Sequence, residues 1–511
     1  MNLAQHLMRS GNILADAPAL CVGTQVYASF GQLARTAAQL AGTMTGKLGL
    51  VRGDRVAILM KNVPQYVEVL YAAWHAGLVA VPINARLHPR ELAYILDNSG
   101  AKVCFATDDL MEVVSPVLAN IPALEQLICV GDEDYRRICR ADAIPMRDCE
   151  PAAGAWLSYT SGTTGTPKGA ELSHRNLLLM GAGYQIDVER VSPVDRLLHL
   201  GPMSHGSGVY ILTRVASGAA QIIPESSGFD PAEVFSIIAR HPRVSFFAAP
   251  TMVKRLVSSP EAQNADTQNL GTIVYGGAPM YLEDLKRALA LFGPKLAQVY
   301  GQSESPMAIT VLPKAVHADS AHPDFEERIA SVGVTQSIVE VRIADQDGRA
   351  VPAGEMGEVI VRGDTVMSGY WQNVEATKSA IRDGWLFTGD VAVMNDKGFV
   401  TLKDRSKDVI ISGGLNIYPR EVEEVLLRHP LVSEVSVIGR KDPKWGESVV
   451  AFVACLAGQQ VNEAELDQLC LDNIARYKRP KEYRFMDHLP KSGVGKILKR
   501  ELRSQLSSDP V

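Results

Sequence analysis

Residues 160–169 read Thr160-Ser161-Gly162-Thr163-Thr164-Gly165-Thr166-Pro167-Lys168-Gly169, and no other stretch of the chain is more informative. Three glycines permit tight turns and close approach of the backbone to a ligand. The hydroxyl side chains and the lysine add hydrogen-bond donors and one positive charge. Successive N–H groups in such a loop form a concave anion site. We therefore predict a phosphate-binding loop, with a flexible surface loop as the alternative.

The residues around this loop set its structural context. Residues 156–159 are typical of a β-strand that leads into it. The loop is not a Walker A motif, which needs Gly-Lys-Ser/Thr at the start of a helix, because Lys168 lies between a proline and a glycine. The other Gly-Lys pair, Gly495-Lys496, is followed by Ile497. A P-loop NTPase is therefore disfavoured, although a nucleotide is still the expected ligand.

Length and charge narrow the class of protein. The chain has 511 residues, which favours about three domains, and 46% of them are hydrophobic, as in a globular protein. The formal net charge is −6, and no long basic block occurs. We therefore expect no nucleic-acid partner.

Cysteine usage and hydropathy indicate the compartment. The seven cysteines are scattered and form no Cys-x-x-Cys pair, so free thiols in a reducing environment are expected. The first residues lack the basic and apolar regions of a signal peptide. The longest apolar stretch, residues 69–83, is interrupted by His75 and Gly77 and is too short to span a bilayer. We expect a cytoplasmic protein with no integral membrane segment.

Strand and helix patterns alternate over the first three hundred residues, which predicts βαβ units and a largely parallel sheet. Strands are predicted at residues 54–59, 102–106, 196–200, 244–247 and 272–275, and helices at 66–76, 91–98 and 231–240.

The pattern changes after about residue 331. Residues 339–343 and 357–362 alternate apolar and polar side chains around a turn at Asp347-Gly348, which predicts a small antiparallel β-rich unit. The charged residues 404–408 are suited to an exposed linker. A second small α/β unit follows, with a helix from Pro419 to Leu427, strands at 435–438 and 449–455, and a helix at 463–474.

Four further segments point to one family when they are taken in order. They are Tyr300-Gly301-Gln302-Ser303-Glu304, residues 385–390 with Thr388-Gly389-Asp390, residues 404–423 with Gly413-Gly414, and residues 490–496. With the loop at 160–169, they resemble five motifs of the adenylate-forming superfamily of acyl-CoA synthetases, adenylation domains and firefly luciferase. Ser303 stands where the family usually has threonine. The resemblance covers nearly the whole chain.

This resemblance implies an α/β enzyme with a mobile part. A large N-terminal domain of βαβ-type sheets, residues 1–403, would include the β-rich subdomain at 331–403. A hinge at 404–408 would join it to a small mobile α/β C-terminal domain, residues 409–511. A carboxylate would attack the α-phosphate of ATP to give acyl-adenylate and pyrophosphate, and the thiol of coenzyme A would then displace AMP. Both steps build negative charge, so positioning and charge stabilisation are the protein's task.

The resemblance also implies roles for the residues that face ATP. Lys168 and the loop would hold the β- and γ-phosphates, and the loop residues concerned are Thr160, Ser161, Gly162, Thr163, Thr164 and Gly165. Glu304, together with Thr160, would bind Mg²⁺, a hard cation that prefers oxygen ligands. The hydroxyl of Ser303 would reach the α-phosphate. A surface glutamate is the alternative for Glu304.

A second set would hold the nucleoside. Tyr300, followed by Gly301 and Gln302, would stack on adenine, and Gly276, Gly277, Ala278 and Pro279 would form the opposite wall. Asp390 and Arg405 would bind the ribose hydroxyls, the first as acceptor and the second as donor. A core aromatic residue is the alternative for Tyr300, a turn residue for Asp390, and a solvated charge for Arg405.

The C-terminal motifs would act by moving. Lys496, next to Gly495, would meet the substrate carboxylate and the α-phosphate during adenylation only. Lys407 would be the pivot about which the small domain rotates after pyrophosphate leaves. Gly413 and Gly414 would line the pantetheine tunnel in the second conformation, and Glu447 would belong to the same face.

The acid would bind near His205, which in this family often faces the acyl carboxylate; a core histidine is the alternative. Nearby segments are mostly apolar, with Met203, Tyr210, Phe246, Phe247, Met280 and Tyr281. An apolar fatty or aromatic acid is therefore expected, because an unpaired buried charge is costly. Arg243 and Arg255 keep open a dicarboxylate such as malonate.

Other outcomes within this fold stay open. A stand-alone enzyme that loads a carrier protein, a luciferase-like oxygenase and a non-catalytic acyl or nucleotide sensor are the alternatives to an acid–CoA ligase. No carrier domain follows residue 511, which favours free coenzyme A as the acceptor. The sequence leaves the oligomeric state, including a homodimer, undetermined.

Overall fold

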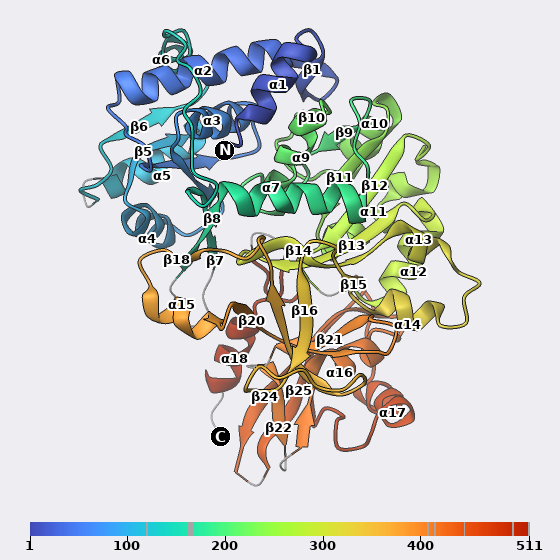
Figure 1. Cartoon of the computed structure of the whole chain (residues 1–511). Helices are drawn as coiled ribbons and strands as arrows, with labels where there is room; N and C mark the ends of the chain where they lie inside the picture. Colours follow the sequence, from blue (N-terminus) through green and yellow to red (C-terminus); the bar gives the residue numbers. More distant parts are fainter. Residues whose placement is uncertain are drawn as a thin grey trace.

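The computed structural model describes residues 1–118, 121–160, 167–278, 280–405, 408–412, 415–443, 445–492 and 495–508. Within these residues the chain forms a seven-stranded sheet, a nine-stranded sheet and two five-stranded sheets, surrounded by helices (Figure 1). The predicted fold class is confirmed: two large α/β sheets, a β-rich part and a small C-terminal α/β unit follow one another along the chain.

The seven-stranded sheet has the order β18-β8-β7-β4-β3-β5-β6. Strands β7, β4, β3, β5 and β6 run parallel, and β8 and β18 are antiparallel to their neighbours. The strands are β3 Arg55–Met60, β4 Val79–Asn84, β5 Ala101–Ala106, β6 Gln126–Cys129, β7 Gly154–Thr160, β8 Lys168–Ser173 and β18 Gly369–Tyr370. Its helices are α2 Phe30–Gly46, α3 Gln65–His75, α4 Pro89–Ser99, α5 Asp108–Leu118 and α6 Glu133–Ile138.

The nine-stranded sheet has the order β15-β14-β13-β12-β11-β9-β10-β1-β2, with β13 to β1 parallel. The strands are β1 Pro18–Val22, β2 Gln25–Ser29, β9 Arg196–Leu198, β10 Ala220–Ile223, β11 Val244–Ala248, β12 Leu270–Gly276, β13 Leu296–Gln302, β14 Ser305–Leu312 and β15 Val334–Thr335. The helices are α1 Gln5–Ile13, α7 His174–Gly183, α8 Gly206–Val209, α9 Ile211–Ala216, α10 Pro231–Arg240, α11 Pro250–Val257, α12 Leu282–Phe292, α13 Lys314–Ala318 and α14 Phe325–Ala330.

The long apolar stretch predicted to be a buried helix and strand is α3 followed by β4. All six residues of β4 are buried, and ten of the eleven residues of α3 are buried as well. The sheet and its covering helices thus account for the hydrophobicity of residues 69–83. In the described part of the chain, no helix combines the length and apolarity that crossing a bilayer requires.

The β-rich part is antiparallel, as the alternating pattern predicts. Its strands are β16 Glu340–Ala344, β17 Met356–Arg362, β19 Ile381–Arg382, β20 Trp385–Met394 and β21 Val400–Arg405, and α15 Val374–Ala380 precedes β19. One segment leaves this unit: β18 pairs with β8 at the edge of the seven-stranded sheet. A two-residue strand has no periodicity, so the sequence analysis did not find it.

The C-terminal unit, residues 408–508, lies against the rest of the protein at the lower side of Figure 1. Its sheet contains β22 Ile410–Ser412, β23 Leu415–Ile417, β24 Val432–Asp442, β25 Gly446–Cys455 and β26 Glu482–Met486. Its helices are α16 Pro419–Leu426, α17 Glu463–Asn473 and α18 Lys499–Ser508.

The charged segment that leads into this unit differs from the expected exposed linker. Strand β21 continues through Arg405, and the Asp404 side chain is only 9% exposed. Asp404 accepts a hydrogen bond from the backbone N–H of Arg420 and lies 4.0 Å from Nζ of Lys499. These two partners lie 16 and 95 residues away along the chain. The local charge pattern was therefore misleading, because it contains no information about them.

Candidate active site

Three neighbouring parallel strands end at the same edge of the nine-stranded sheet. These are β11, β12 and β13, and their ends lead into Pro250, Gly277 and Ser303 respectively. Ligands of open α/β sheets bind outside the carboxyl ends of the strands. The predicted glycine wall and the Tyr300 motif therefore lie side by side, with Gly276 opposite Val299 in register.

The glycines of these strand ends permit close backbone packing. A Cβ atom on Gly276 would clash with the carbonyl oxygen of Val299, and one on Gly301 would clash with the backbone N of Met307. Gly277 has a φ of +79°, a left-handed conformation that glycine adopts without strain. Ala278 follows Gly277 in the segment after β12. A larger residue at Gly276 or Gly301 would force the strands apart.

The structure brings Tyr300, Gln302 and Asp390 together. The hydroxyl of Tyr300 donates to Oδ2 of Asp390 at 2.7 Å, and Nε2 of Gln302 donates to the same oxygen at 2.6 Å. Nε2 of Gln302 also donates to the carbonyl of Thr388 at 2.9 Å. Asp390 lies on β20, so these bonds join the β-rich sheet to β13. Tyr300 is therefore both a member of the hydrophobic core, at 8% exposed, and a hydrogen-bond donor to Asp390.

A turn holds Asp390 in place. Gly389 has a φ of +73°, and its N–H donates to Oε1 of Glu358 at 2.7 Å. Thr388 Oγ1 donates to the carbonyl of Val359 at 2.7 Å and accepts from the N–H of Asp390 at 3.1 Å. Asp390 also pairs with Arg405 across β20 and β21. The two residues predicted to bind ribose are therefore neighbours in one sheet.

Lys168 and Glu304 are joined through a residue that the sequence analysis did not consider. Nζ of Lys168 lies 5.3 Å from the ring centre of Tyr370, and the Tyr370 hydroxyl donates to Oε1 of Glu304 at 2.6 Å. Glu304 is only 8% exposed, so the surface alternative for it is wrong. No pattern marks Tyr370 in the sequence, because its place depends on the pairing of β18 with β8.

The donor set around Glu304 fits a divalent cation. Tyr370 binds Oε1, and within the described residues no hydrogen bond reaches Oε2. The described residues also contain no cluster of three or more His, Cys, Asp or Glu side chains that could hold a metal on its own. Mg²⁺ is typically held by one or two carboxylates together with substrate phosphates. A single carboxylate connected through Tyr370 to Lys168, which flanks the predicted phosphate loop, agrees with that arrangement.

His205 precedes α8 and is exposed to solvent, so it is not a core histidine. Its Nδ1 lies 3.2 Å from Oγ of Ser204. Surrounding protein atoms lower the pKa of His205 from its usual value by desolvation. The core histidine of this region is His199, whose ring nitrogens bond Ser207 at 2.8 Å and Gln221 at 2.9 Å. At pH 7, His205 is thus a neutral, solvent-exposed imidazole.

The apolar residues of the segments near His205 divide between two environments. Phe247 packs against Tyr210, with ring centroids 6.0 Å apart, and lies near Gly206 together with Met307. Phe246 points to the other face of β11, as strand alternation requires, and is buried in the core. Met203 and Met280 are also core residues, and Tyr281 binds Glu423 of the C-terminal unit. These four residues therefore belong to the core or to the contact with the C-terminal unit.

The two arginines considered for a dicarboxylate are occupied elsewhere. Nε of Arg243 lies 2.6 Å from Oδ1 of Asp195, and the guanidinium of Arg255 lies 4.6 Å above the ring of Phe229. The sequence analysis missed Arg214, which is fully buried and bonds Oε1 of Glu189 at 2.6 Å. Neither Arg243 nor Arg255 therefore supports a second substrate carboxylate.

The C-terminal lysine loop meets the N-terminal part of the protein. A Cβ atom on Gly495 would lie 2.7 Å from Oγ1 of Thr251, at the start of α11. Gly495 has a φ of +82°, and the N–H of Lys496 donates to Oγ of Ser492 at 3.2 Å. The loop that carries Lys496 is thus brought to the strand edge where β11 ends. A side chain at residue 495 would interfere with this approach.

Several predicted site residues lie outside the described part of the structure. They are Ser161, Gly162, Thr163, Thr164, Gly165, Pro279, Lys407, Gly413 and Gly414, and the side chains of Thr160 and Arg405. The flanking strands are described: Thr160 and Lys168 pair in register at the ends of β7 and β8. The loop between them therefore begins and ends at one sheet edge.

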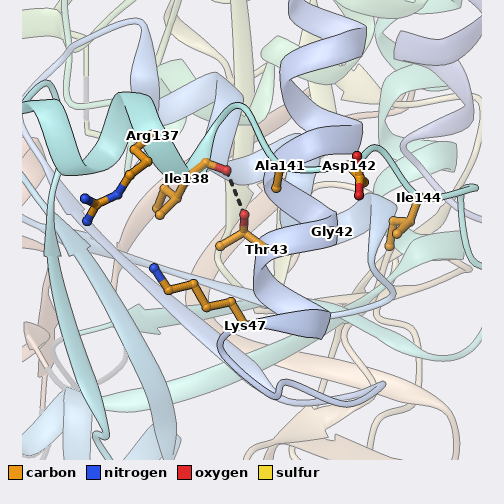
Figure 2. Close-up of a pocket in the computed structure, with 8 residues that line it drawn as sticks. All are labelled: Gly42, Thr43, Lys47, Arg137, Ile138, Ala141, Asp142 and Ile144. Carbon is orange, nitrogen blue, oxygen red and sulfur yellow. Dashed lines mark hydrogen bonds between the residues drawn. The ribbon is translucent and has the colours of Figure 1, made fainter.

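A separate hollow lies between α2 and the end of α6 with the segment that follows it (Figure 2). Two of its polar side chains have protein partners: Oγ1 of Thr43 donates to the carbonyl of Ile138 at 2.7 Å, and Arg137 pairs with Asp134 at 2.7 Å. None of the predicted site residues lines it. We do not assign it a function.

The fold and this set of residues define an adenylate-forming enzyme. The ATP-bound structure of MatB from Rhodopseudomonas palustris superposes with a TM-score of 0.89, covers 99% of both chains and is 28% identical. The AMP-binding enzyme profile matches residues 9–371, and the AMP-binding enzyme C-terminal domain profile matches residues 421–496. The chain therefore belongs to the AMP-binding enzyme family.

Its similar relatives include acid–CoA ligases of different specificity. A feruloyl-CoA synthase of Amycolatopsis is 38% identical over 481 residues, which cover 93% of each chain. The long-chain-fatty-acid–CoA ligase FadD13 of Mycobacterium tuberculosis is 34% identical over 491 residues, which cover 95% of this chain and 94% of that one. The similarity extends over nearly the full length of all these proteins.

Proposed function

We propose that this chain is an AMP-forming acid–CoA ligase, which activates a carboxylic acid with ATP and transfers the acyl group to coenzyme A. The observation that carries the proposal is a set of contacts between three sheets: Tyr300 and Gln302 bond Asp390, and Tyr370 connects the neighbouring Glu304 to Lys168. Tyr300, Gln302 and Asp390 offer hydrogen-bonding groups for a nucleoside. Lys168 and Glu304 offer the charges that phosphates and a cation require. Full-length similarity to acid–CoA ligases supports the same conclusion.

The nucleotide would lie across the ends of β12 and β13. Asp390 and Arg405 would bind the ribose hydroxyls, and the aromatic ring of Tyr300 would pack against adenine opposite Gly276 and Gly277. Lys168 and the loop at 161–166 would hold the β- and γ-phosphates. Mg²⁺ would neutralise phosphate charge when bound at Glu304, with Thr160 as a second oxygen donor. The protein thereby fixes the α-phosphate in position for attack.

The acid would lie between His205 and the strand ends, with its tail against Phe247 and Tyr210. Lys496 would place its ammonium group where the acid carboxylate meets the α-phosphate and would offset the negative charge that develops there. The contact of Gly495 with Thr251 supports this placement. The neutral ring of His205 can donate or accept a hydrogen bond without adding charge.

Thioester formation would need a second arrangement of the C-terminal unit. We place the hinge at 404–408 with Lys407 as pivot, between an N-terminal domain of residues 1–403 and a C-terminal domain of residues 409–511. Rotation would withdraw Lys496 and bring Gly413 and Gly414 to the acyl-adenylate, where glycine leaves room for the pantetheine arm. Glu447, whose Oε2 accepts from the N–H of Ile411 at 2.7 Å, would fix the strand beside that tunnel.

A fatty or aromatic monocarboxylic acid is the substrate that this site favours. The wall that includes Phe247 and Tyr210 is apolar, and Arg243 and Arg255 are both engaged in other contacts. The two relatives described above act on a feruloyl group and on long-chain fatty acids, respectively. Both classes present an apolar tail behind one carboxylate.

Mass spectrometry of the reaction products tests this function. The protein is incubated with Mg-ATP, coenzyme A and a panel of short to long fatty acids, benzoates, cinnamates and malonate. We expect acyl-CoA and AMP from an acid with an apolar tail. Acyl-adenylate without thioester would move the assignment to an enzyme that loads a carrier protein. Failure to form adenylate from any acid would contradict the proposal.

A further inference from the structure

Strand β18 carries one residue that contacts two parts of the site at once. This strand, Gly369–Tyr370, is antiparallel to β8, with Tyr370 opposite Ala170. Lys168 lies two residues before Ala170 on β8, at the end of the phosphate loop. Tyr370 therefore stands beside the lysine that faces phosphate.

Lys168 and Glu304 belong to different sheets. Lys168 is in the seven-stranded sheet, whereas Glu304 lies between β13 and β14 of the nine-stranded sheet. Their relative position is therefore not fixed by the hydrogen bonds of either sheet alone. A connection between the two sheets is needed to hold the phosphate-binding charge and the cation-binding carboxylate at a constant separation.

The segment at 367–371 supplies this connection through its backbone. The N–H of Met367 donates to the carbonyl of Glu304 at 2.7 Å, and the N–H of Trp371 donates to the carbonyl of Gly169 at 2.7 Å. Oγ1 of Thr377 accepts from the N–H of Tyr370 at 2.8 Å. The backbone around Tyr370 is thus bound on one side to the Glu304 turn and on the other to the strand of Lys168.

The side chain of Tyr370 continues the connection. Its ring faces Nζ of Lys168 at 5.3 Å, a distance at which an ammonium group is attracted to an aromatic face. Its hydroxyl donates to Oε1 of Glu304 at 2.6 Å. One carboxylate oxygen of Glu304 is thereby occupied, and within the described residues no hydrogen bond reaches the other. The ring and the hydroxyl therefore act on different partners.

We propose that Tyr370 is a positioning residue with two separable roles. The hydroxyl orients Glu304 so that Oε2 faces the cation that accompanies ATP, and the ring holds Lys168 toward the phosphates. This inference rests on the proposed function of the site as an ATP-binding site. Tyr370 itself contacts neither the acid nor coenzyme A in this proposal.

Two substitutions separate these roles. Tyr370→Phe keeps the ring under Lys168 and removes only the bond to Glu304. Tyr370→Leu removes both contacts. We expect Tyr370→Phe to raise the Mg²⁺ concentration for half-maximal ATP binding about tenfold, the size expected for a lost hydrogen bond to a charged group, while ATP binding in EDTA stays at the wild-type level. Tyr370→Leu should weaken ATP binding in EDTA as well.

Isothermal titration calorimetry measures both quantities on the full chain without turnover. Tyr135→Phe is the matched control, because the Tyr135 hydroxyl donates to Oε2 of Glu68 at 2.7 Å, far from this site. Thermal unfolding shows whether each variant is folded. An unchanged Mg²⁺ requirement in folded Tyr370→Phe, or the same shift in Tyr135→Phe, would overturn the proposal.

Failure of the proposed function gives a different result. In that case the wild-type protein makes no acyl-CoA in the product assay, whatever its ATP binding. The Mg²⁺ dependence of ATP binding in wild type and Tyr370→Phe still decides the role of Tyr370. Equal losses of ATP binding in Tyr370→Phe and Tyr370→Leu, with and without Mg²⁺, would contradict the separation of the two roles.

Discussion

The hydroxyl of Tyr281 donates a hydrogen bond of 3.1 Å to Oε2 of Glu423, and this bond joins the start of α12 to α16 of the C-terminal unit. Oε1 of the same carboxylate accepts from the N–H of Val437 at 2.8 Å and lies 3.2 Å from Nζ of Lys499. Nearby, Nζ of Lys254 donates to the carbonyl of Ser433 at 2.8 Å. These contacts hold the C-terminal unit in the arrangement that places Lys496 at the strand edge.

Removing the hydroxyl of Tyr281 should weaken this arrangement selectively. If the bond to Glu423 exists in one of two arrangements only, its loss shifts the balance by about 1 kcal/mol, or about fivefold. We expect Tyr281→Phe to slow ATP–pyrophosphate exchange by up to this factor. Thioester formation from supplied acyl-adenylate should keep its wild-type rate or increase. Both rates are measured with the acid identified by the product assay.

Tyr275→Phe is the matched control for this prediction. The Tyr275 hydroxyl bonds Nε2 of His317 at 2.9 Å, and both residues lie within the N-terminal part of the protein. It should therefore change the two half-reactions equally or not at all. Equal slowing of both half-reactions by Tyr281→Phe would show that Tyr281 is only a packing residue.

Lys496→Ala should separate the half-reactions more strongly. Adenylation should fall by at least about a hundredfold, the range observed when one group that stabilises transition-state charge is removed. Thioester formation from supplied acyl-adenylate should persist, because Lys496 is proposed to act in the first step only. Lys491→Ala removes a nearby lysine that pairs with Glu434 and should leave adenylation within about twofold, since exposed ion pairs contribute little. Equal loss of both steps in Lys496→Ala would refute the two-arrangement mechanism.

Local periodicity was sufficient to predict several elements of this fold. The helix at 231–240 matches α10 residue for residue, because Pro231 starts it, Asp230 caps it and its apolar positions recur on one face. The strands at 54–59 and 272–275 agree with β3 and β12 to within a few residues. These signals depend on neighbours within one element, so the sequence displays them directly.

Contacts between distant segments could not be predicted in this way. Phe246 and Phe247 are equally apolar, and only the position of the sheet decides which one faces the site. Tyr370 gives no signal, because its role comes from pairing with a strand about 200 residues earlier in the chain. The sequence around Asp404 predicts an exposed charge, whereas in the structure Asp404 lies close to Lys499. The residue types were known from the sequence, but which distant residues contact each other was not.

The pH dependence of adenylation should reflect a neutral His205. Desolvation by the surrounding protein atoms lowers the pKa of this ring below its usual value of about 6.5, so it is uncharged at pH 7 and becomes protonated only as the pH falls further. We expect kcat/KM for the acid to be level from pH 8 to about 6.5 and to decline at lower pH. His205→Gln keeps hydrogen-bonding groups but cannot titrate, so this decline should be absent. An unchanged acid limb in His205→Gln would assign the titration to another group.

The stability of the C-terminal unit should depend on Lys499. Its side chain is 21% exposed and lies 3.2 Å from Oε1 of Glu423 and 4.0 Å from Oδ2 of Asp404. Lys499→Met would remove one cation from between these carboxylates, so we expect a loss of about 2 to 3 kcal/mol in the free energy of unfolding, below the full cost of breaking a completely buried pair. Urea denaturation at pH 7 measures this loss. Lys499→Arg, which retains the charge, should recover at least half of it.

The contacts of Lys499 with Glu423 and Asp404 also predict how the stability of the protein changes at alkaline pH. Although burial opposes it, the attraction of Glu423, Asp404 and Asp408 raises the pKa of Lys499 above its usual value of about 10.5. A lysine with a raised pKa contributes its full stabilisation below the pKa of the unfolded chain and loses it as the pH rises through the folded value. Wild-type stability should therefore decline above about pH 10.5 more steeply than that of Lys499→Met. Parallel declines in the two proteins would show that Lys499 does not carry this stabilisation.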